Sequence, residues 1–343
     1  MTAASPNDEQ MMELARRIGS ESKKLARPNP WVGAVLLTPQ GNVTTGATGE
    51  PGKAHAEITA LDKAGTDARG ATMWVTLEPC AHFGKTPPCV DRIIEAQLQR
   101  VVIGLIDPDH RVNGAGIAKL RDAGIEVVLG IGRRQNAEML LPYLISRTWG
   151  RPLVTLKLAM TLDGYIAAAD SSSNWISNAV SRARVHSIRS DHDAIVVGAG
   201  TIVHDNPRLD VRNDAGVRQV NSPRRVVLGT IPEDAAVLPA LAWQGDVESL
   251  VAHLGAEGAL SVMVEGGAKV AHSFLHASLV DQFHLFIAPK VLGGSSGVRL
   301  FEGDGAQSII EALDFKLDRS LIHQGDVELI LNSQAVYDLI NSA

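Results

Sequence analysis

The stretch from Ala54 to Cys89 constrains this chain more than any other, because it holds both of its cysteines. It opens with His55-Ala56-Glu57 and continues with Glu78-Pro79-Cys80 and Pro87-Pro88-Cys89. An imidazole and two thiolates occupy three positions of a tetrahedral zinc ion and leave the fourth for water, which is the ligand set of a catalytic site. The spacing therefore predicts a zinc ion held by His55, Cys80 and Cys89.

Glu57 is the predicted catalytic acid and base of this site. It lies two residues after His55, at the start of an expected helix, so its carboxylate can lie beside the metal without binding it. There it can take a proton from water and pass it to a leaving amine. The run 72–77 predicts a strand that ends before Cys80, and 90–95 predicts a helix whose N-terminus favours the Cys89 thiolate.

Two other interpretations of the stretch stay open at this point. Cysteines in an intracellular protein are often inert buried residues. A structural zinc site is the second alternative, and His82 is the nearby candidate for its fourth ligand. In that case the second half of the chain would bind a nucleotide as a regulator.

Length and composition narrow the class of protein. A chain of 343 residues predicts two domains. A net charge of -6 and an aromatic content of 4% argue against a nucleic-acid partner and favour a small, soluble nucleotide-like substrate. The sequence has no apolar run of membrane-spanning length and no signal-peptide pattern, so we expect a cytoplasmic protein without a membrane partner.

The pattern of elements predicts where the two domains meet. A helix over 8–24, strands at 32–37, 72–77, 101–106 and 125–129, and helices between them predict an α/β sandwich with both faces covered. A change in composition at 147–152 predicts the linker, so the domains are expected at 1–150 and 151–343. In the second, strands are expected at 152–160, 193–201, 261–264 and 283–289, and helices at 178–190 and 268–277.

Glycines after two of these strands are candidate ligand loops. Gly198-Ala199-Gly200 lacks the third glycine of the dinucleotide fingerprint, because Val203 occupies its position. Gly266-Gly267 precedes a helix and could cradle a phosphate or form a plain turn. Solvated surface is the favoured interpretation for the basic residues near these loops, which are Lys157, Arg189, Arg208 and Arg212.

The motifs together resemble the RibD family of bifunctional riboflavin biosynthesis enzymes. In the first half the resemblance rests on His55-Ala56-Glu57, Thr76-Leu77-Glu78-Pro79-Cys80 and Gly84-Lys85-Thr86-Pro87-Pro88-Cys89. In the second half it rests on Leu162-Asp163-Gly164, Asn174-Trp175-Ile176-Ser177, Asp205-Asn206-Pro207, Val264-Glu265-Gly266-Gly267 and Ala288-Pro289-Lys290. The resemblance implies a cytidine-deaminase-like α/β/α sandwich followed by a dihydrofolate-reductase-like α/β domain.

The resemblance also implies two consecutive reactions. Zinc-dependent hydrolysis would remove the 2-amino group of a diaminohydroxyphosphoribosylaminopyrimidine, and NADPH would then reduce the ribosyl group to ribityl. The rival interpretation is a deaminase of free or polymeric nucleobases whose C-terminal half is degenerate. A homo-oligomer is expected.

Site residues follow from the resemblance position by position. Those that would contact substrate are Asn29, His82 and Lys85 in the deaminase half, and Ser173, Arg189, Leu209, Arg212 and Glu265 in the reductase half. Those that would contact NADPH are Ala159, Trp175, Thr201, Asp205, Gly266 and Gly267. Two residues depart from the family pattern near the deaminase substrate: Thr48 replaces a usual histidine and Ala81 a usual serine.

Overall fold

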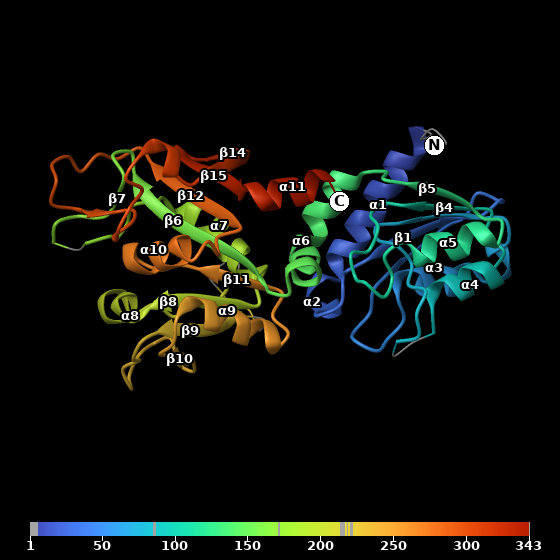
Figure 1. The fold of residues 1–343 in the computed structure, drawn as a ribbon, viewed down its shortest axis with the longest axis horizontal. Helices are drawn as coiled ribbons and strands as arrows, with labels where there is room; N and C mark the ends of the chain where they lie inside the picture. The colour runs from blue at the N-terminus through green and yellow to red at the C-terminus, as the bar shows by residue number, and fades with distance from the viewer. Residues whose placement is uncertain are drawn as a thin grey trace. The chain divides into compact units, whose positions relative to one another are not determined.

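The computed structural model describes residues 6–84, 87–170, 172–212, 217, 219 and 222–342 (Figure 1). The chain divides into two compact units between Gly150 and Arg151. The second unit ends at Asp338, and the C-terminal residues from Leu339 belong to the first unit. The expected second domain, 151–343, therefore extends a few residues too far.

The first unit is built on a five-stranded sheet in the order β2-β1-β3-β4-β5. β1 pairs antiparallel with both β2 and β3, whereas β3, β4 and β5 are parallel. The strands are β1 (Gly33–Leu37), β2 (Val43–Ala47), β3 (Thr72–Val75), β4 (Arg100–Ile103) and β5 (Glu126–Leu129). The helices are α1 (Pro6–Glu21), α2 (Lys23–Ala26), α3 (Ala56–Ala64), η1 (Gly65–Ala68), α4 (Cys89–Glu95), α5 (Ala115–Asp122) and α6 (Arg133–Trp149).

Two glycines let helices approach opposite faces of this sheet. A Cβ on Gly33 would lie 1.9 Å from the Ala15 carbonyl oxygen of α1, and one on Gly46 would lie 2.0 Å from that of Ala56 in α3. Gly46 pairs with Ala34, so Gly33 and Gly46 point to opposite faces. The sheet is therefore covered on both sides, with α3 packed against β2 and β1.

The second unit contains an eight-stranded sheet in the order β10-β9-β8-β11-β6-β12-β15-β14. The strands from β10 to β12 are parallel, and β15 and β14 complete the sheet by antiparallel pairing. In that order they are Leu241–Trp243, Arg224–Leu228, Ala194–Gly198, Ser261–Val264, Leu153–Thr161, Gln282–Ala288, Asp326–Ser333 and Phe315–His323. β7 (Tyr165–Ala167) and β13 (Val298–Arg299) form a separate small sheet.

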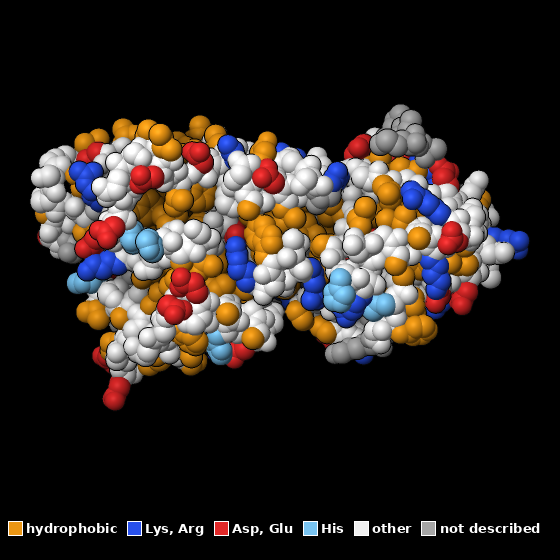
Figure 2. Space-filling view, viewed as in Figure 1, with side chains coloured by type: hydrophobic (Ala, Val, Ile, Leu, Met, Phe, Trp, Pro, Cys, Tyr) orange, Lys and Arg blue, Asp and Glu red, His pale blue; other side chains and the backbone are white. Residues whose placement is uncertain are grey.

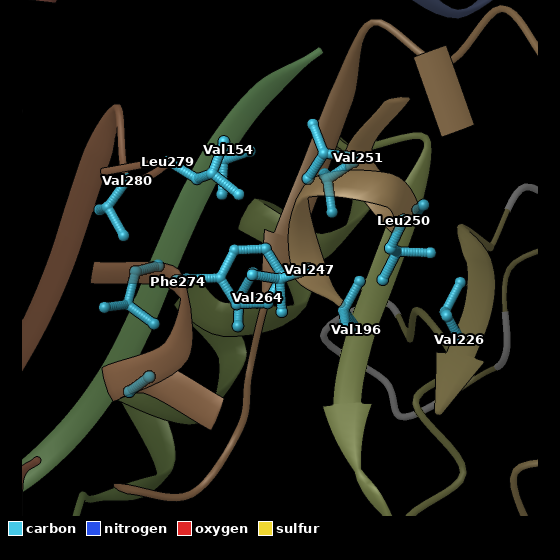
Figure 3. Close-up of a cluster of buried hydrophobic side chains, with 14 of the residues drawn as sticks. Val154, Val196, Val226, Val247, Leu250, Val251, Val264, Phe274, Leu279 and Val280 are labelled. Carbon is cyan, nitrogen blue, oxygen red and sulfur yellow. The ribbon is translucent and has the colours of Figure 1, made fainter. Parts of the chain in front are cut away.

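Helices cover both faces of the larger sheet. Phe274 of α10 and Leu250 of α9 pack with Val262 and Val264 in one buried cluster (Figure 3). Met263, between those two valines, packs with α7 on the opposite face. The helices of this unit are α7 (Ala179–Ser190), α8 (Ala199–Asp205), α9 (Val247–Ala256), α10 (Ala268–His276) and η2 (Ile309–Glu311). The last helix, α11 (Gln334–Ser342), begins in this unit and ends in residues assigned to the first.

Several expected elements differ from those in the structure. The predicted linker 147–152 is shorter, because α6 continues to Trp149 and ends at Gly150, whose φ of 68° suits glycine. The expected strand over 193–201 ends at Gly198, and α8 begins at the next residue. Among the described residues, no helix is long and apolar enough to cross a membrane.

Candidate functional site

Three elements of the first unit bring the predicted zinc ligands together. His55 is the residue that precedes α3, Cys80 lies in the loop after β3, and Cys89 is the first residue of α4. The Cys80 carbonyl accepts a hydrogen bond from the Val90 amide at 3.2 Å, and the Cys80 sulfur accepts one from the Cys89 amide at 3.3 Å. These two hydrogen bonds hold the backbone at Cys80 against the start of α4.

The geometry of these side chains fits a zinc ion. The His55 Nδ1 atom lies 3.2 Å from the Cys89 sulfur and 3.6 Å from the Cys80 sulfur, and the three donor atoms lie within 4.8 Å of one another. Tetrahedral zinc with ordinary bond lengths separates a nitrogen from a sulfur ligand by about 3.5 Å. Both cysteines are free thiols, so no disulfide competes with the metal.

His82 does not complete a closed metal shell. In the described part of the chain the metal-ligand group comprises His55, Cys80 and Cys89 only. The Nδ1 atom of His82 is buried and has no hydrogen-bond partner among the residues that the structure describes. A structural site with four protein ligands is therefore not what the geometry supports, and the His82 ring remains available to a ligand.

Burial and hydrogen bonds among the ligands shift the pKa values of three groups in this pocket. Burial raises the pKa of the Glu57 carboxyl to about 7. The hydrogen bond with Cys80 raises the pKa of His55 to about 9, and zinc binding would displace that proton. Hydrogen bonds from Cys89 lower the pKa of Cys80 to about 4. A carboxyl group with a pKa near 7 can both accept and return a proton at neutral pH, as the role predicted for Glu57 requires.

A cavity of about 240 Å³ adjoins the ligands and contains most of the predicted deaminase contacts. Asn29, His82, Glu57 and Thr48 line it. The Thr48 hydroxyl accepts a hydrogen bond from the Val32 amide at 3.0 Å, so part of its capacity is used locally. Lys85 lies outside the described residues, and Ala81 is half-buried beside Cys80.

Other residues of this cavity were missed by sequence reasoning. They follow β3 or β4 or come from α6, and they are Glu78, Asp107, Asp109, Arg111, Tyr143 and Arg147. β3 and β4 are parallel neighbours, so the residues after them share one edge of the sheet. The Asp107-Pro108-Asp109 run after an expected strand was the available signal, because ligands bind at the carboxyl ends of such strands.

The second unit brings its charged residues to the carboxyl edge of its parallel strands. The register pairs Val264 with both Val196 and Leu156, so Glu265 lies level with Lys157. The Glu265 carboxylate accepts two hydrogen bonds from Arg189, at 2.5 and 2.8 Å. Arg212 donates to Asp210 at 3.1 Å, and the Asp210 carbonyl accepts from Arg189 at 3.4 Å.

Lys157 was wrongly expected at the surface. Burial lowers the pKa of its amine, and the ammonium group lies 5.7 Å from the centre of the Phe286 ring. β6 is a central strand with helices on both faces, so Lys157 is half-buried rather than on the open surface. Lys157, Arg189 and Glu265 therefore form one group of interacting charges.

Most of the predicted NADPH residues lie at this edge too. Ala159 lies near the end of β6, Thr201 and Asp205 belong to α8 directly after β8, and Gly266 and Gly267 follow β11. Trp175 lies in the segment before α7 with 63% of its surface exposed, and Arg182 stacks over its ring at 4.3 Å.

Two predicted substrate contacts lie less directly at this edge. Ser173 is half-buried in the segment before α7, close in sequence to Trp175. The Leu209 side chain is buried in a hydrophobic cluster with Ile195 and Val197, so only its backbone is available to a substrate.

Family models match both halves of the chain. The cytidine and deoxycytidylate deaminase zinc-binding region matches residues 5–105, and the RibD C-terminal domain matches residues 152–328. A riboflavin biosynthesis protein RibD of Bacillus amyloliquefaciens is 38% identical over 332 residues, which cover 87% of this chain and 88% of that protein. One of Corynebacterium ammoniagenes is 40% identical over 299 residues and covers 85% and 88%.

Solved structures extend the similarity to the fold. RibD of Acinetobacter baumannii matches with a TM-score of 0.86 and 31% identity over 95% of this chain and 99% of that one. A Thermotoga maritima diaminohydroxyphosphoribosylaminopyrimidine deaminase/5-amino-6-(5-phosphoribosylamino)uracil reductase matches with a TM-score of 0.83 and 33% identity over 95% and 98%. The expected deaminase-like and dihydrofolate-reductase-like folds are confirmed, as is zinc as a cofactor.

We predict that Cys80→Ser removes zinc from the purified protein, because a serine hydroxyl stays protonated where a thiolate binds the ion. Metal analysis of the full chain should show about one zinc fewer per chain than in the wild type. His82→Ala is the matched control and should keep the ion. Equal loss of zinc in both variants would show that His82 is a ligand.

We predict that Gly267→Ala weakens NADPH binding without destabilising the protein. A Cβ at Gly267 meets no atom of the described residues within 4 Å, whereas one at Gly266 lies 2.4 Å from the Val270 side chain. A loss of affinity at Gly267 therefore reports contact with the cofactor. Gly266→Ala should reduce both thermal stability and affinity, and unchanged NADPH affinity in Gly267→Ala would place the cofactor elsewhere.

Proposed function

Because the chain belongs to the RibD family of riboflavin biosynthesis proteins, we propose that its two domains act in sequence on one pyrimidine nucleotide. It is a bifunctional enzyme with a zinc-dependent deaminase domain and an NADPH-dependent reductase domain. The rival interpretation of a degenerate C-terminal half is not favoured, because the RibD C-terminal model extends from 152 to 328.

The first proposed step is hydrolytic deamination of 2,5-diamino-6-(5-phosphoribosylamino)pyrimidin-4-one. His55, Cys80 and Cys89 would hold zinc, which when bound activates a water toward the pyrimidine ring. The Glu57 carboxylate takes the proton released by that water and returns it to the departing amino group as ammonia forms. Asn29 and His82 line the same cavity and are proposed to orient the ring. The observation that carries this proposal is the buried Glu57 beside three converging zinc donors.

The second proposed step is reduction of the ribosyl group to ribityl by NADPH. Ala159 near the end of β6, Thr201 and Asp205 of α8, and Gly266 and Gly267 after β11 would hold the cofactor together with Trp175. Ser173, Arg189, Leu209, Arg212 and Glu265 are proposed to contact the substrate. A guanidinium group binds phosphate oxygens through paired N–H donors, which suits Arg189 and Arg212 to a nucleotide.

The distribution of charged side chains on the surface supports a small soluble substrate rather than a nucleic-acid strand. Acidic and basic side chains are interspersed within each unit on the face drawn in Figure 2. A protein that grips a nucleic-acid strand needs a continuous basic stripe. We also propose that the enzyme works in the cytoplasm, where zinc-binding thiols stay reduced.

We further propose that the enzyme is a homo-oligomer that associates through β14. This strand lies at the edge of the eight-stranded sheet, and it exposes Leu317, Leu321 and Ile322, the last with 79% of its surface accessible. Exposed apolar edge strands associate with other chains unless they are covered. A second copy of this strand is the proposed cover.

Glu57→Gln is expected to lower the deaminase kcat by about 10² to 10⁴-fold, because the amide can neither accept nor return the proton. Reduction of the deaminated substrate should continue at the wild-type rate. Ammonia release and NADPH oxidation, followed separately, measure the two steps. Ammonia release at the wild-type rate by a variant that retains zinc would contradict the role of Glu57.

Ile322→Lys is expected to shift the protein toward the monomer in sedimentation equilibrium, because it places a charge on the proposed interface. Val43→Lys, a change at an exposed position of the first unit, is the control and should leave the assembly intact. An unaltered molar mass in Ile322→Lys would place the interface away from β14.

A further inference from the structure

The deaminase cavity contains a pair of cations that the proposed reaction has not used. Arg111 lies in the segment between β4 and α5, and Arg147 lies near the end of α6. Both line the cavity that His55 and Cys80 also line. Their side chains are 52% and 36% exposed, so both guanidinium groups are open to an entering ligand.

Buried partners hold these open cations in place. Asp109, whose side chain is only 6% exposed, accepts hydrogen bonds from Arg111 Nε at 2.9 Å and Nη2 at 2.6 Å. The Arg147 Nε atom lies 3.7 Å from the same carboxylate, and its guanidinium stacks over the Tyr143 ring at 5.2 Å. Tyr143 in turn donates to Asp107 at 3.1 Å. Neither arginine has to be ordered when a ligand binds.

The guanidinium donors that remain unused at this end of the cavity favour an anion. The hydrogen bonds from Arg111 lower the pKa of Asp109, so it is ionised, but one carboxylate balances only one of the two guanidinium groups. Burial raises the pKa of Asp107 to about 6, so this carboxyl is mostly ionised at neutral pH, and it accepts a hydrogen bond from the Tyr143 hydroxyl. A guanidinium has five N–H donors, and Asp109 occupies two side-chain donors of Arg111 within the described residues. The rest are suited to phosphate oxygens.

Glu78 sets the position of this cation pair relative to the metal ligands. It lies two residues before Cys80, and its carboxylate accepts hydrogen bonds from the amides of Asp107, Gly114, Gly116 and Ile117, at 3.3, 2.9, 2.9 and 3.2 Å. The segment that carries Arg111 is therefore fixed to the segment that carries Cys80. A ligand with its ring at one end and an anion at the other would span a fixed distance.

We propose that Arg111 and Arg147 form the phosphate subsite of the deaminase domain and that Asp109 is the residue that positions them. The subsite would take the 5-phosphate of the ribosylamino-pyrimidine and so would make the enzyme prefer the nucleotide over the nucleoside. This inference rests on the proposed deamination, and it assigns to that reaction a specificity determinant.

The test compares deamination of the nucleotide with deamination of its dephosphorylated counterpart. Arg111→Gln and Arg147→Gln should each raise KM for the nucleotide by about 10- to 100-fold, the size of a lost charge-assisted hydrogen bond, with kcat within about two-fold of the wild type. KM for the dephosphorylated substrate should be unchanged. Asp109→Asn should raise KM for the nucleotide in the same selective way.

Controls separate this result from misfolding. Each variant should retain zinc and the wild-type reductase activity, and Arg121→Gln, at an exposed arginine of α5, should behave as the wild type. An equal rise in KM for both substrates, or no rise for either, would overturn the subsite.

A binding measurement distinguishes failure of the subsite from failure of the proposed function. Calorimetry with ribose 5-phosphate should show binding to the wild-type full chain that is lost in part in the Arg111→Gln, Arg147→Gln double variant. If the wild type deaminates neither substrate, the proposed deamination fails, and this titration still decides whether the arginines bind a phosphate. Identical titrations of the wild type and the double variant would refute the subsite.

Discussion

Parallel pairing of neighbouring strands is the constraint on which both sites depend. In the first unit β3 and β4 are parallel, so the segments that carry Cys80 and Arg111 leave the sheet at the same edge. In the second unit β8, β11, β6 and β12 are parallel, and most of the predicted cofactor contacts lie at or just beyond the carboxyl ends of the first three. Residues far apart in the chain meet because the strands before them point the same way.

The metal site adds a chemical constraint to this topology. Thiolate and imidazole ligands must be deprotonated to bind zinc, and a hydrogen bond from the Cys89 amide to the Cys80 sulfur favours the thiolate. Glu57 must instead be able to gain and lose a proton, and burial raises its pKa to about 7. One end of α3 thus presents a metal ligand and a proton carrier two residues apart, each in an environment suited to its own charge.

Features that depend on residues close together in the sequence, such as the zinc ligands and the cap of α7, could be predicted from the sequence alone. His55, Cys80 and Cys89 are recognisable because their residue types and spacing are those of a zinc site, and the cap of α7 is recognisable because Asn178 accepts hydrogen bonds from Val180 and Ser181. α6 was not expected, since Pro142 interrupts its pattern, yet the packed helix tolerates it. Arg111 and Arg147 were out of reach, because only the tertiary fold brings them together.

Buried carboxylates give the two domains a common electrostatic design. In the deaminase domain Asp109 faces two arginines, and in the reductase domain Glu265 faces Arg189 and Lys157. Burial opposes ionisation of Glu265, but Arg189 and Lys157 lower its pKa below the ordinary value. In the reductase domain burial makes the positive charge that Glu265 does not balance costly, whereas in the deaminase domain Arg111 and Arg147 keep exposed N–H donors for a ligand. An anionic substrate relieves that cost in the one domain and binds those donors in the other, so a single phosphorylated compound suits both domains in turn.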